Sequence, residues 1–160
     1  MKFRINLAMQ HLDLMDDDGS VINSWPVSTA ANGAGEVSGS LQTPRGRHIV
    51  RAKIGNGQPM NAVFVGRRPT GEVYQPELGL EEAGRDWILT RILWLSGMEP
   101  GFNRLGERDS MRRYIYIHGT PDEKFEPVPQ SHGCIRMRNA DLVELFDQTP
   151  VYTPVEIVEG

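Results

Sequence analysis

The stretch SHGCIRM, residues 131–137, contains the only cysteine of the chain, Cys134, with a histidine two positions before it. Upstream, an apolar run ends at His118, which is followed by a glycine. A free thiol has a pKa of about 8.5, so it needs a nearby base to act as a nucleophile at neutral pH. An imidazole can take the thiol proton, and backbone N–H groups in a glycine-containing turn can bind the oxyanion that forms next. Together the two segments provide the parts of a cysteine-dependent acyl-transfer site.

The sequence around these segments predicts how they meet. Residues 113–118 alternate in character and predict a strand, with both tyrosines and His118 on one face. Three prolines in residues 121–129 predict a loop, which can fold back and bring Cys134 beside the end of that strand. Asn139 is typical of a helix N-cap, so a short amphipathic helix is expected to follow the cysteine turn.

The composition indicates a globular protein with a single domain, residues 1–160. The chain is 39% hydrophobic and 24% charged, and its 17 glycines and 11 prolines favour a turn-rich, mostly β fold. The net charge of −4 argues against nucleic acid as the main partner, because phosphate binding requires a basic face. No run approaches the roughly 18 apolar residues that a membrane-spanning helix requires.

Alternating apolar residues predict further strands, which are separated by segments rich in glycine, proline and polar residues. One apolar run is long enough for a helix, but its β-branched and aromatic content favours a strand over residues 86–95. The expected strands are residues 3–15 with a break near residue 10, 21–27, 48–54, 60–65, 86–95 and 153–158. The expected loops are residues 28–47 and 98–108, and the charged, turn-rich residues 66–84 are expected to form a surface excursion.

The same residues allow other interpretations at this point. A lone cysteine before a helix is often a small buried apolar residue. His132, beside a glycine, is as compatible with a structural hydrogen bond as with proton transfer. A metal site built from His118, His132 and Cys134 lacks both a recurring zinc spacing and an apparent fourth ligand. His11 and His48 are interpreted as structural.

Several segments resemble the signature of the YkuD-type L,D-transpeptidases. The resemblance rests on His118-Gly119-Thr120 followed by SHGCIRM and, upstream, on residues 27–30, 39–40 and 43–46. It extends over most of the chain, and an SHGC core with an upstream His-Gly is a specific pattern. The resemblance implies a mostly β, sandwich-like catalytic domain with one or two short helices. It also implies acyl transfer on the stem tetrapeptides of bacterial peptidoglycan, inhibition by carbapenems, and no metal or organic cofactor.

The resemblance also assigns roles to single residues. By this resemblance Cys134 attacks the L-centre carbonyl of the third stem residue, a diaminopimelate, and the terminal D-alanine leaves. His118 is the general base, and the backbone carbonyl of Gly119 orients its ring, where some family members carry a serine. The candidates for shaping the oxyanion turn and contacting the substrate are Ser131, His132, Gly133, Arg136 and Tyr116.

Two of these roles carry specific expectations. The N–H groups of Gly133 and Cys134 are expected to face the oxyanion, and Arg136 is expected to hold a substrate carboxylate. Another branch of the family carries an asparagine at this arginine position. We also expect activity to rise between about pH 5 and 8 as His118 loses its proton or forms an ion pair with the thiolate.

The start of the chain bears on the acceptor. Its first residues contain no long apolar segment and no small-residue cleavage site, so no signal peptide is predicted. If Met1 is the native start, we expect a cytosolic L,D-carboxypeptidase that trims tetrapeptides or muropeptides with water during peptidoglycan recycling. If a leader has been removed, the alternative is a periplasmic L,D-transpeptidase that forms 3-3 cross-links or protein attachments. An alternative of another class is a non-catalytic peptidoglycan-binding module.

Overall fold

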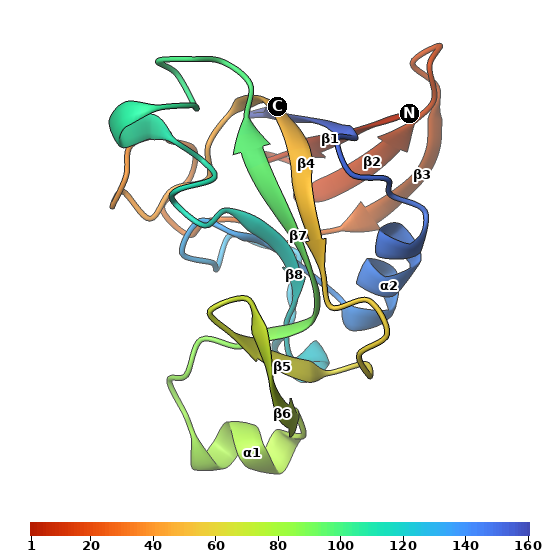
Figure 1. Cartoon of the computed structure of the whole chain (residues 1–160), viewed down its shortest axis with the longest axis vertical. Coiled ribbons are helices and arrows are strands. Elements are labelled where there is room, and N and C mark those ends of the chain that lie inside the picture. The colour runs from red at the N-terminus through yellow and green to blue at the C-terminus, as the bar shows by residue number, and fades with distance from the viewer.

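Strands dominate the computed structural model, which describes all residues from 1 to 160 (Figure 1). The strands are β1 (Lys2–Asn6), β2 (His11–Met15), β3 (Val21–Pro26), β4 (Gly46–Ile54), β5 (Ala62–Val65), β6 (Arg68–Val73), β7 (Ile88–Gly97), β8 (Tyr116–Gly119), β9 (Ile135–Met137) and β10 (Pro154–Val158). The helices are α1 (Pro76–Glu81) and α2 (Asn139–Asp147), with short 3-10 turns at Gly106–Arg108 and Asp122–Lys124. The mostly β fold class with short helices is as the sequence predicts.

One hydrogen-bonded sheet contains all ten strands, and it branches at β7. Its main path runs β3-β2-β1-β10-β4-β7-β5-β6. Strand β7 also pairs with β8, and β8 pairs in parallel with β9. Register shifts occur where β7 meets β4 and β8, and such irregularities bend a sheet locally. The branch places the short strands β8 and β9 near the middle of the molecule, as Figure 1 shows for β8.

The main core lies between the N-terminal strands, the β8–β9 pair and α2. Side chains that alternate along these strands point inward, as expected for strands with one buried face. Helix α2 contributes three apolar residues at helical spacing. The eighteen core residues are Phe3, Ile5, Leu12, Leu14, Trp25, Val27, Val50, Leu93, Leu95, Ile115, Ile117, Ile135, Met137, Leu142, Leu145, Phe146, Val155 and Ile157.

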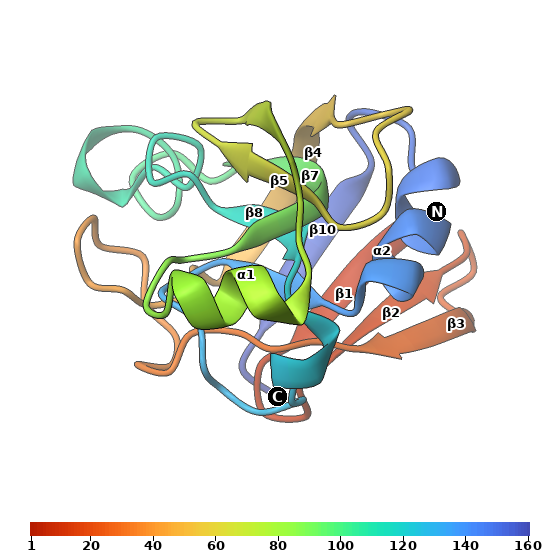
Figure 2. The same cartoon turned by 90° about the horizontal axis from the view of Figure 1, so that it is seen from below.

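Helix α2 lies beside the strands β2 and β3 in both views, whereas α1 lies beyond the β5–β6 hairpin (Figures 1 and 2). In Figure 1, α1 is at the end of the molecule opposite the two chain termini. Neither helix is long and apolar enough to cross a membrane. The predicted strands at the N-terminus, at residues 48–54 and 86–95 and at the C-terminus are confirmed within a few residues.

Two local predictions are wrong, and two segments contain elements that the sequence did not predict. The surface segment of residues 66–84 contains β6, which pairs with β5, and then α1; β6 is largely exposed, so it has no apolar alternation to detect. The strand predicted over residues 113–118 begins only at Tyr116, because Tyr114 has a left-handed φ of 58° within a turn. The short helix predicted after the cysteine turn is confirmed as α2, although the unpredicted strand β9 lies between the turn and this helix. Asn139 is not the N-cap of α2; that position is Arg138, and Asn139 is fully buried.

Candidate active site

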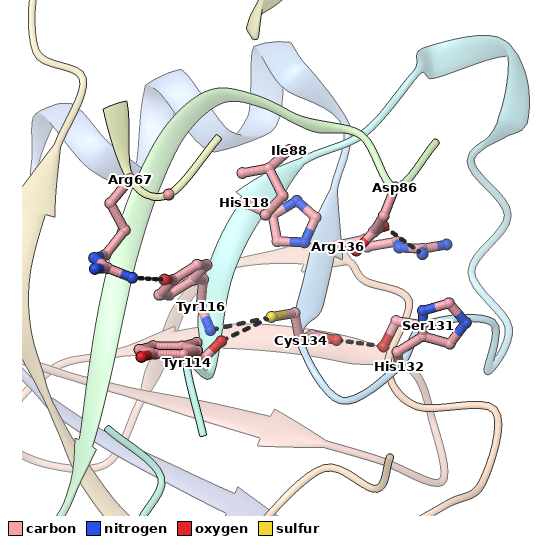
Figure 3. A pocket seen from close by; sticks show the side chains of 11 residues that line it. Arg67, Asp86, Ile88, Tyr114, Tyr116, His118, Ser131, His132, Cys134 and Arg136 are labelled. Atoms are coloured by element: carbon pink, nitrogen blue, oxygen red, sulfur yellow. Dashed lines mark hydrogen bonds and ion pairs between the residues drawn. The ribbon is translucent and has the colours of Figure 1, made fainter. Parts of the chain in front are cut away.

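Two short parallel strands assemble the reactive side chains. In the register of β8 and β9, His118 is the partner of Arg136. Tyr116 and Cys134 each stand two residues earlier in the chain, and side chains two residues apart share a face of a strand. The intervening isoleucines point to the other face, into the main core. The alternation that fills the core therefore also brings the candidate base, the thiol and Arg136 to one surface, and Figure 3 shows them together.

This surface forms the wall of a cavity of about 480 Å³. All the candidate residues from the sequence line this cavity, apart from the two glycines. Residues from the turn between β5 and β6 and from the start of β7 form the rest of its wall. The lining residues are Gly66, Arg67, Asp86, Ile88, Tyr114, Tyr116, His118, Ser131, His132, Cys134 and Arg136. The cavity is thus large enough for several residues of a peptide side by side with the thiol.

The thiol of Cys134 is held by backbone groups of the preceding strand. It donates a hydrogen bond to the carbonyl of Tyr114 at 3.2 Å and accepts one from the N–H of Tyr116 at 3.4 Å. Burial raises the pKa of Cys134 to about 11, and the Tyr116 N–H and the nearby Arg136 only partly oppose this. At neutral pH the resting sulfur is therefore a protonated thiol.

His118 is oriented by the next residue. Its Nδ1 lies 2.7 Å from the carbonyl oxygen of Gly119, so Nδ1 carries the proton and Nε2 is left as the acceptor. The ring is 2% exposed, and this burial lowers the pKa of His118 to about 4. The resting imidazole is therefore a neutral base. No hydrogen bond joins it to the thiol, although both face the cavity in Figure 3.

These pKa directions correct the expected pH dependence. A rise in activity between pH 5 and 8 requires a His118 pKa within that range, and burial places it lower. A preformed thiolate–imidazolium pair is also disfavoured, since both groups are neutral at rest. The arrangement instead favours transfer of the thiol proton to Nε2 during attack, as in general-base catalysis.

The glycine turn before β9 is fixed by hydroxyl groups. The hydroxyl of Ser131 donates to the carbonyl of Cys134 at 2.6 Å and accepts from the N–H of Gly133 at 3.2 Å. Gly133 has a left-handed φ of 130°, and its carbonyl accepts from the hydroxyl of Thr43 at 2.9 Å. The N–H of Gly133 is thus already engaged, contrary to its expected role, whereas the N–H of Cys134 donates to no group of the chain.

His132 and Arg136 lie at one side of the cavity with Asp86. His132 is exposed and makes no hydrogen bond within the protein, so a role in proton transfer stays a prediction. Arg136 lies 3.5 Å from Asp86, and its Nε is buried without a partner. An arginine with unused donors beside the thiol is suited to binding a carboxylate. No three metal-ligating side chains gather anywhere in the chain.

A buried polar network centred on Asn139 lies against the backbone of Gly119. The amide of Asn139 accepts from the hydroxyl of Thr90 at 2.5 Å and donates to the carbonyl of Thr120 at 2.8 Å and to Asp122 at 3.1 Å. A Cβ added to Gly119 would lie 2.2 Å from Asn139 Oδ1 and 2.7 Å from the carbonyl oxygen of Leu89, so a serine does not fit here unless these neighbours shift. The sequence indicated Asn139 only as a helix cap, and no local signal pointed to this network.

Other residues of the site were also missed. Asp86 and Arg67 carry no motif and lie in segments without strong periodicity. Tyr114 contributes a backbone carbonyl, which no side-chain pattern reveals. By contrast, His48 is structural as interpreted, because it is buried and bonded to Gly46 and Ser110.

The model of the YkuD family, described as the L,D-transpeptidase catalytic domain, matches residues 2–157. Over 67 residues the chain is 40% identical to the probable L,D-transpeptidase ErfK/SrfK of Escherichia coli K12, a match over 38% of this chain and 22% of that protein. Over 47 residues it is 40% identical to the probable L,D-transpeptidase YbiS of the same strain, over 29% of this chain and 15% of that protein. These matched segments are short parts of their proteins.

Solved structures share the fold. An L,D-transpeptidase from Xylanimonas cellulosilytica aligns with a TM-score of 0.55 and 20% identity, over 98% of this chain and 59% of that one. The L,D-transpeptidase LdtMt1, solved in complex with imipenem, aligns with a TM-score of 0.56 and 17% identity, over 98% and 57%. The chain thus spans less than two thirds of these structures. With the family match over almost its whole length, the chain belongs to the YkuD family of L,D-transpeptidase catalytic domains.

Proposed function

We propose that this chain is a cysteine acyl-transferase that cleaves the terminal D-alanine from peptidoglycan stem tetrapeptides, with water as the acceptor. The observation that carries the proposal is the pairing of β8 with β9. It places a neutral His118, with Nε2 free, on the same face as the Cys134 thiol. A nucleophile and a base that is oriented by a third group form the usual arrangement for covalent acyl transfer.

The first half-reaction follows from these contacts. As Sγ of Cys134 attacks the carbonyl of the third stem residue, its proton passes to Nε2 of His118. The oxyanion that forms faces the free N–H of Cys134. When the tetrahedral intermediate collapses, the bond to D-alanine breaks, its amine takes the proton from His118, and a thioester remains on Cys134.

The second half-reaction distinguishes the alternatives. In hydrolysis, His118 removes a proton from water, the hydroxide attacks the thioester carbonyl, and the sulfur leaves and regains a proton. In transpeptidation, an amine takes the place of water. The names of the curated relatives, probable L,D-transpeptidases, favour this second candidate. Our proposal of water carries with it a cytosolic role on free tetrapeptides or muropeptides in peptidoglycan recycling.

The experiment is an incubation with a stem tetrapeptide, with and without a second peptide that offers an amine, followed by mass spectrometry of the products. Tripeptide and free D-alanine in both arms support hydrolysis. A joined peptide in the second arm supports transpeptidation instead. Unchanged tetrapeptide in both arms, with measurable binding, supports a binding module.

A carbapenem provides a second test of the nucleophile. We expect it to acylate Cys134, because its lactam carbonyl is open to the same attack as the peptide. The intact mass of the wild-type protein is expected to increase by the mass of the inhibitor. The Cys134→Ala variant is expected to keep its original mass, and an adduct on that variant contradicts the assignment of the nucleophile.

A further inference from the structure

The cavity contains a second arginine on the side away from Arg136. Arg67 lies in the turn between β5 and β6 and lines the same cavity as Cys134. In Figure 3, Arg67 and Arg136 stand on opposite sides of the sulfur. A peptide that crosses the sulfur therefore passes between two cations.

Arg67 is held in place by aromatic side chains. Its Nη1 donates to the hydroxyl of Tyr116 at 3.0 Å, as Figure 3 shows. Its guanidinium carbon lies 4.7 Å from the ring centroid of Trp94 and 5.0 Å from that of Tyr114, which are cation–π distances. Its φ of 64° is in the left-handed region, which is uncommon for a residue with a side chain. These contacts fix the guanidinium before any ligand arrives.

The charge of Arg67 is not compensated within the protein. Arg136 has Asp86 at 3.5 Å, whereas Arg67 forms no ion pair with any carboxylate of the chain. Its only hydrogen bond uses one of five N–H donors. A fixed planar guanidinium with free donors on a cavity wall is suited to two-pronged binding of a carboxylate.

We propose that Arg67 and the hydroxyl of Tyr116 form an anion subsite for a carboxylate on the acyl side of the scissile bond. This proposal rests on the proposed function. If Arg136 holds the terminal carboxylate on the leaving side, the rest of the peptide extends across the sulfur toward Arg67. Two groups can supply the carboxylate: the side chain of the third stem residue, or the residue before it. Both present the same chemistry to the guanidinium.

The test measures kcat and KM with three tetrapeptides: one with both of these carboxylates free, and two in which one or the other is amidated. For the free peptide, Arg67→Met is expected to raise KM roughly tenfold to a hundredfold, as expected when a charge-assisted hydrogen bond is lost. With the wild-type protein, amidating the recognised carboxylate is expected to raise KM similarly. With the peptide that lacks the recognised carboxylate, Arg67→Met is then expected to raise KM little further. The peptide that shows this behaviour identifies the source of the carboxylate.

Two further variants separate recognition from a structural role. Arg68→Met changes the next residue of the hairpin, which is exposed and lines no part of the cavity, and KM is expected to stay within about twofold. Arg67→Lys keeps the charge without the planar fork, so an intermediate KM is expected. If Arg67→Met raises KM by the same factor for the free peptide and for both amidated peptides, the role of Arg67 is structural and the proposed subsite is wrong.

Binding to Cys134→Ala, measured by calorimetry, keeps the subsite testable if the proposed reaction fails. The subsite is supported if one amidated peptide binds Cys134→Ala more weakly than the free peptide does, and if Cys134→Ala/Arg67→Met binds the two peptides equally. This result supports the subsite even if the wild-type protein cleaves nothing. Equal binding of all three peptides to Cys134→Ala overturns the subsite and leaves the proposed function standing if the wild-type protein cleaves them.

Discussion

The β8–β9 pair and the β5–β6 hairpin form facing parts of one cavity, but they are built differently. The β8–β9 pair is buried on both faces, and its reactive side chains are fixed by strand register and backbone hydrogen bonds. In the hairpin, β5 is mostly buried but β6 is largely exposed, and the turn between them contributes one arginine, Arg67, which is bonded to Tyr116. Under the proposed function and the proposed subsite, the buried pair supplies the chemistry, whereas the turn of the hairpin supplies selectivity. Substitutions in the two regions are therefore expected to act on different kinetic constants.

The largest effect is expected at the base. His118→Gln removes the acceptor Nε2, so kcat/KM for tetrapeptide cleavage is expected to fall by about 10²- to 10⁴-fold, the usual contribution of general-base catalysis. His132→Gln, at an exposed position on the same cavity, is the matched control and is expected to cost far less. Equal losses of kcat/KM in the two variants would contradict the assignment of proton transfer to His118.

The buried network behind the base comes next. Asn139→Ala leaves the carbonyl of Thr120 and the hydroxyl of Thr90 without this partner. The free energy of unfolding, measured by urea titration, is expected to fall by about 1–3 kcal/mol. If Asn139 also positions the Gly119 carbonyl, kcat of the folded variant is lower while KM changes little.

The control for this network is Asn32→Ala, which removes an exposed asparagine that does not line the cavity. Its free energy of unfolding is expected to change by at most about 0.5 kcal/mol. An Asn139→Ala protein with reduced stability but wild-type kcat shows that the network stabilises the fold without orienting His118.

The pH profile tests the burial of the catalytic pair. Since His118 acts in its neutral form and burial lowers its pKa to about 4, kcat/KM is expected to be flat from about pH 6 to 8. As the pH falls toward 4, protonation of His118 removes the base and the rate declines. A midpoint near pH 6.5 indicates instead that the imidazole is solvated in the working enzyme.

The smallest effect is expected at the rim. Asp86 is 55% exposed and lies 3.5 Å from Arg136, and an exposed ion pair contributes about 0–1 kcal/mol. Asp86→Asn is therefore expected to change kcat/KM by less than about fivefold. A larger loss of kcat/KM would show that Asp86 fixes Arg136 for substrate binding. Activity would then depend on this exposed ion pair as much as on the β8–β9 pair.

The difference between the two regions also explains what the sequence could predict. Regular alternation and apolar content identified most strands. The resemblance of His118-Gly119 and the cysteine stretch to a family signature indicated the candidate pair, and the fold brings both side chains to one cavity. Strand β9 has only three residues, so it is too short for a periodic pattern, and the left-handed φ of Tyr114 delays the start of β8 to Tyr116. Strand β6 has few apolar residues, so neither this strand nor the place of Arg67 in the turn before it could be predicted.

Long-range polar contacts were the other missing part. Asn139 was interpreted from its position before an apolar helix stripe, which is a local signal. Its actual partners, Thr90 and Thr120, lie far away in the sequence, and only the folded chain brings them together. The engagement of the Gly133 N–H by Ser131 is local, but it depends on a turn geometry that the residue types alone do not fix.

The central claim is that Cys134, with His118 as base, forms a thioester that water resolves. The most direct test is to incubate the protein with a stem tetrapeptide in ¹⁸O-labelled water and to weigh the tripeptide by mass spectrometry. With the wild-type protein, we expect free D-alanine and a tripeptide whose new carboxylate carries one labelled oxygen, and with Cys134→Ala no turnover. Labelled tripeptide from Cys134→Ala at the wild-type rate would contradict the account.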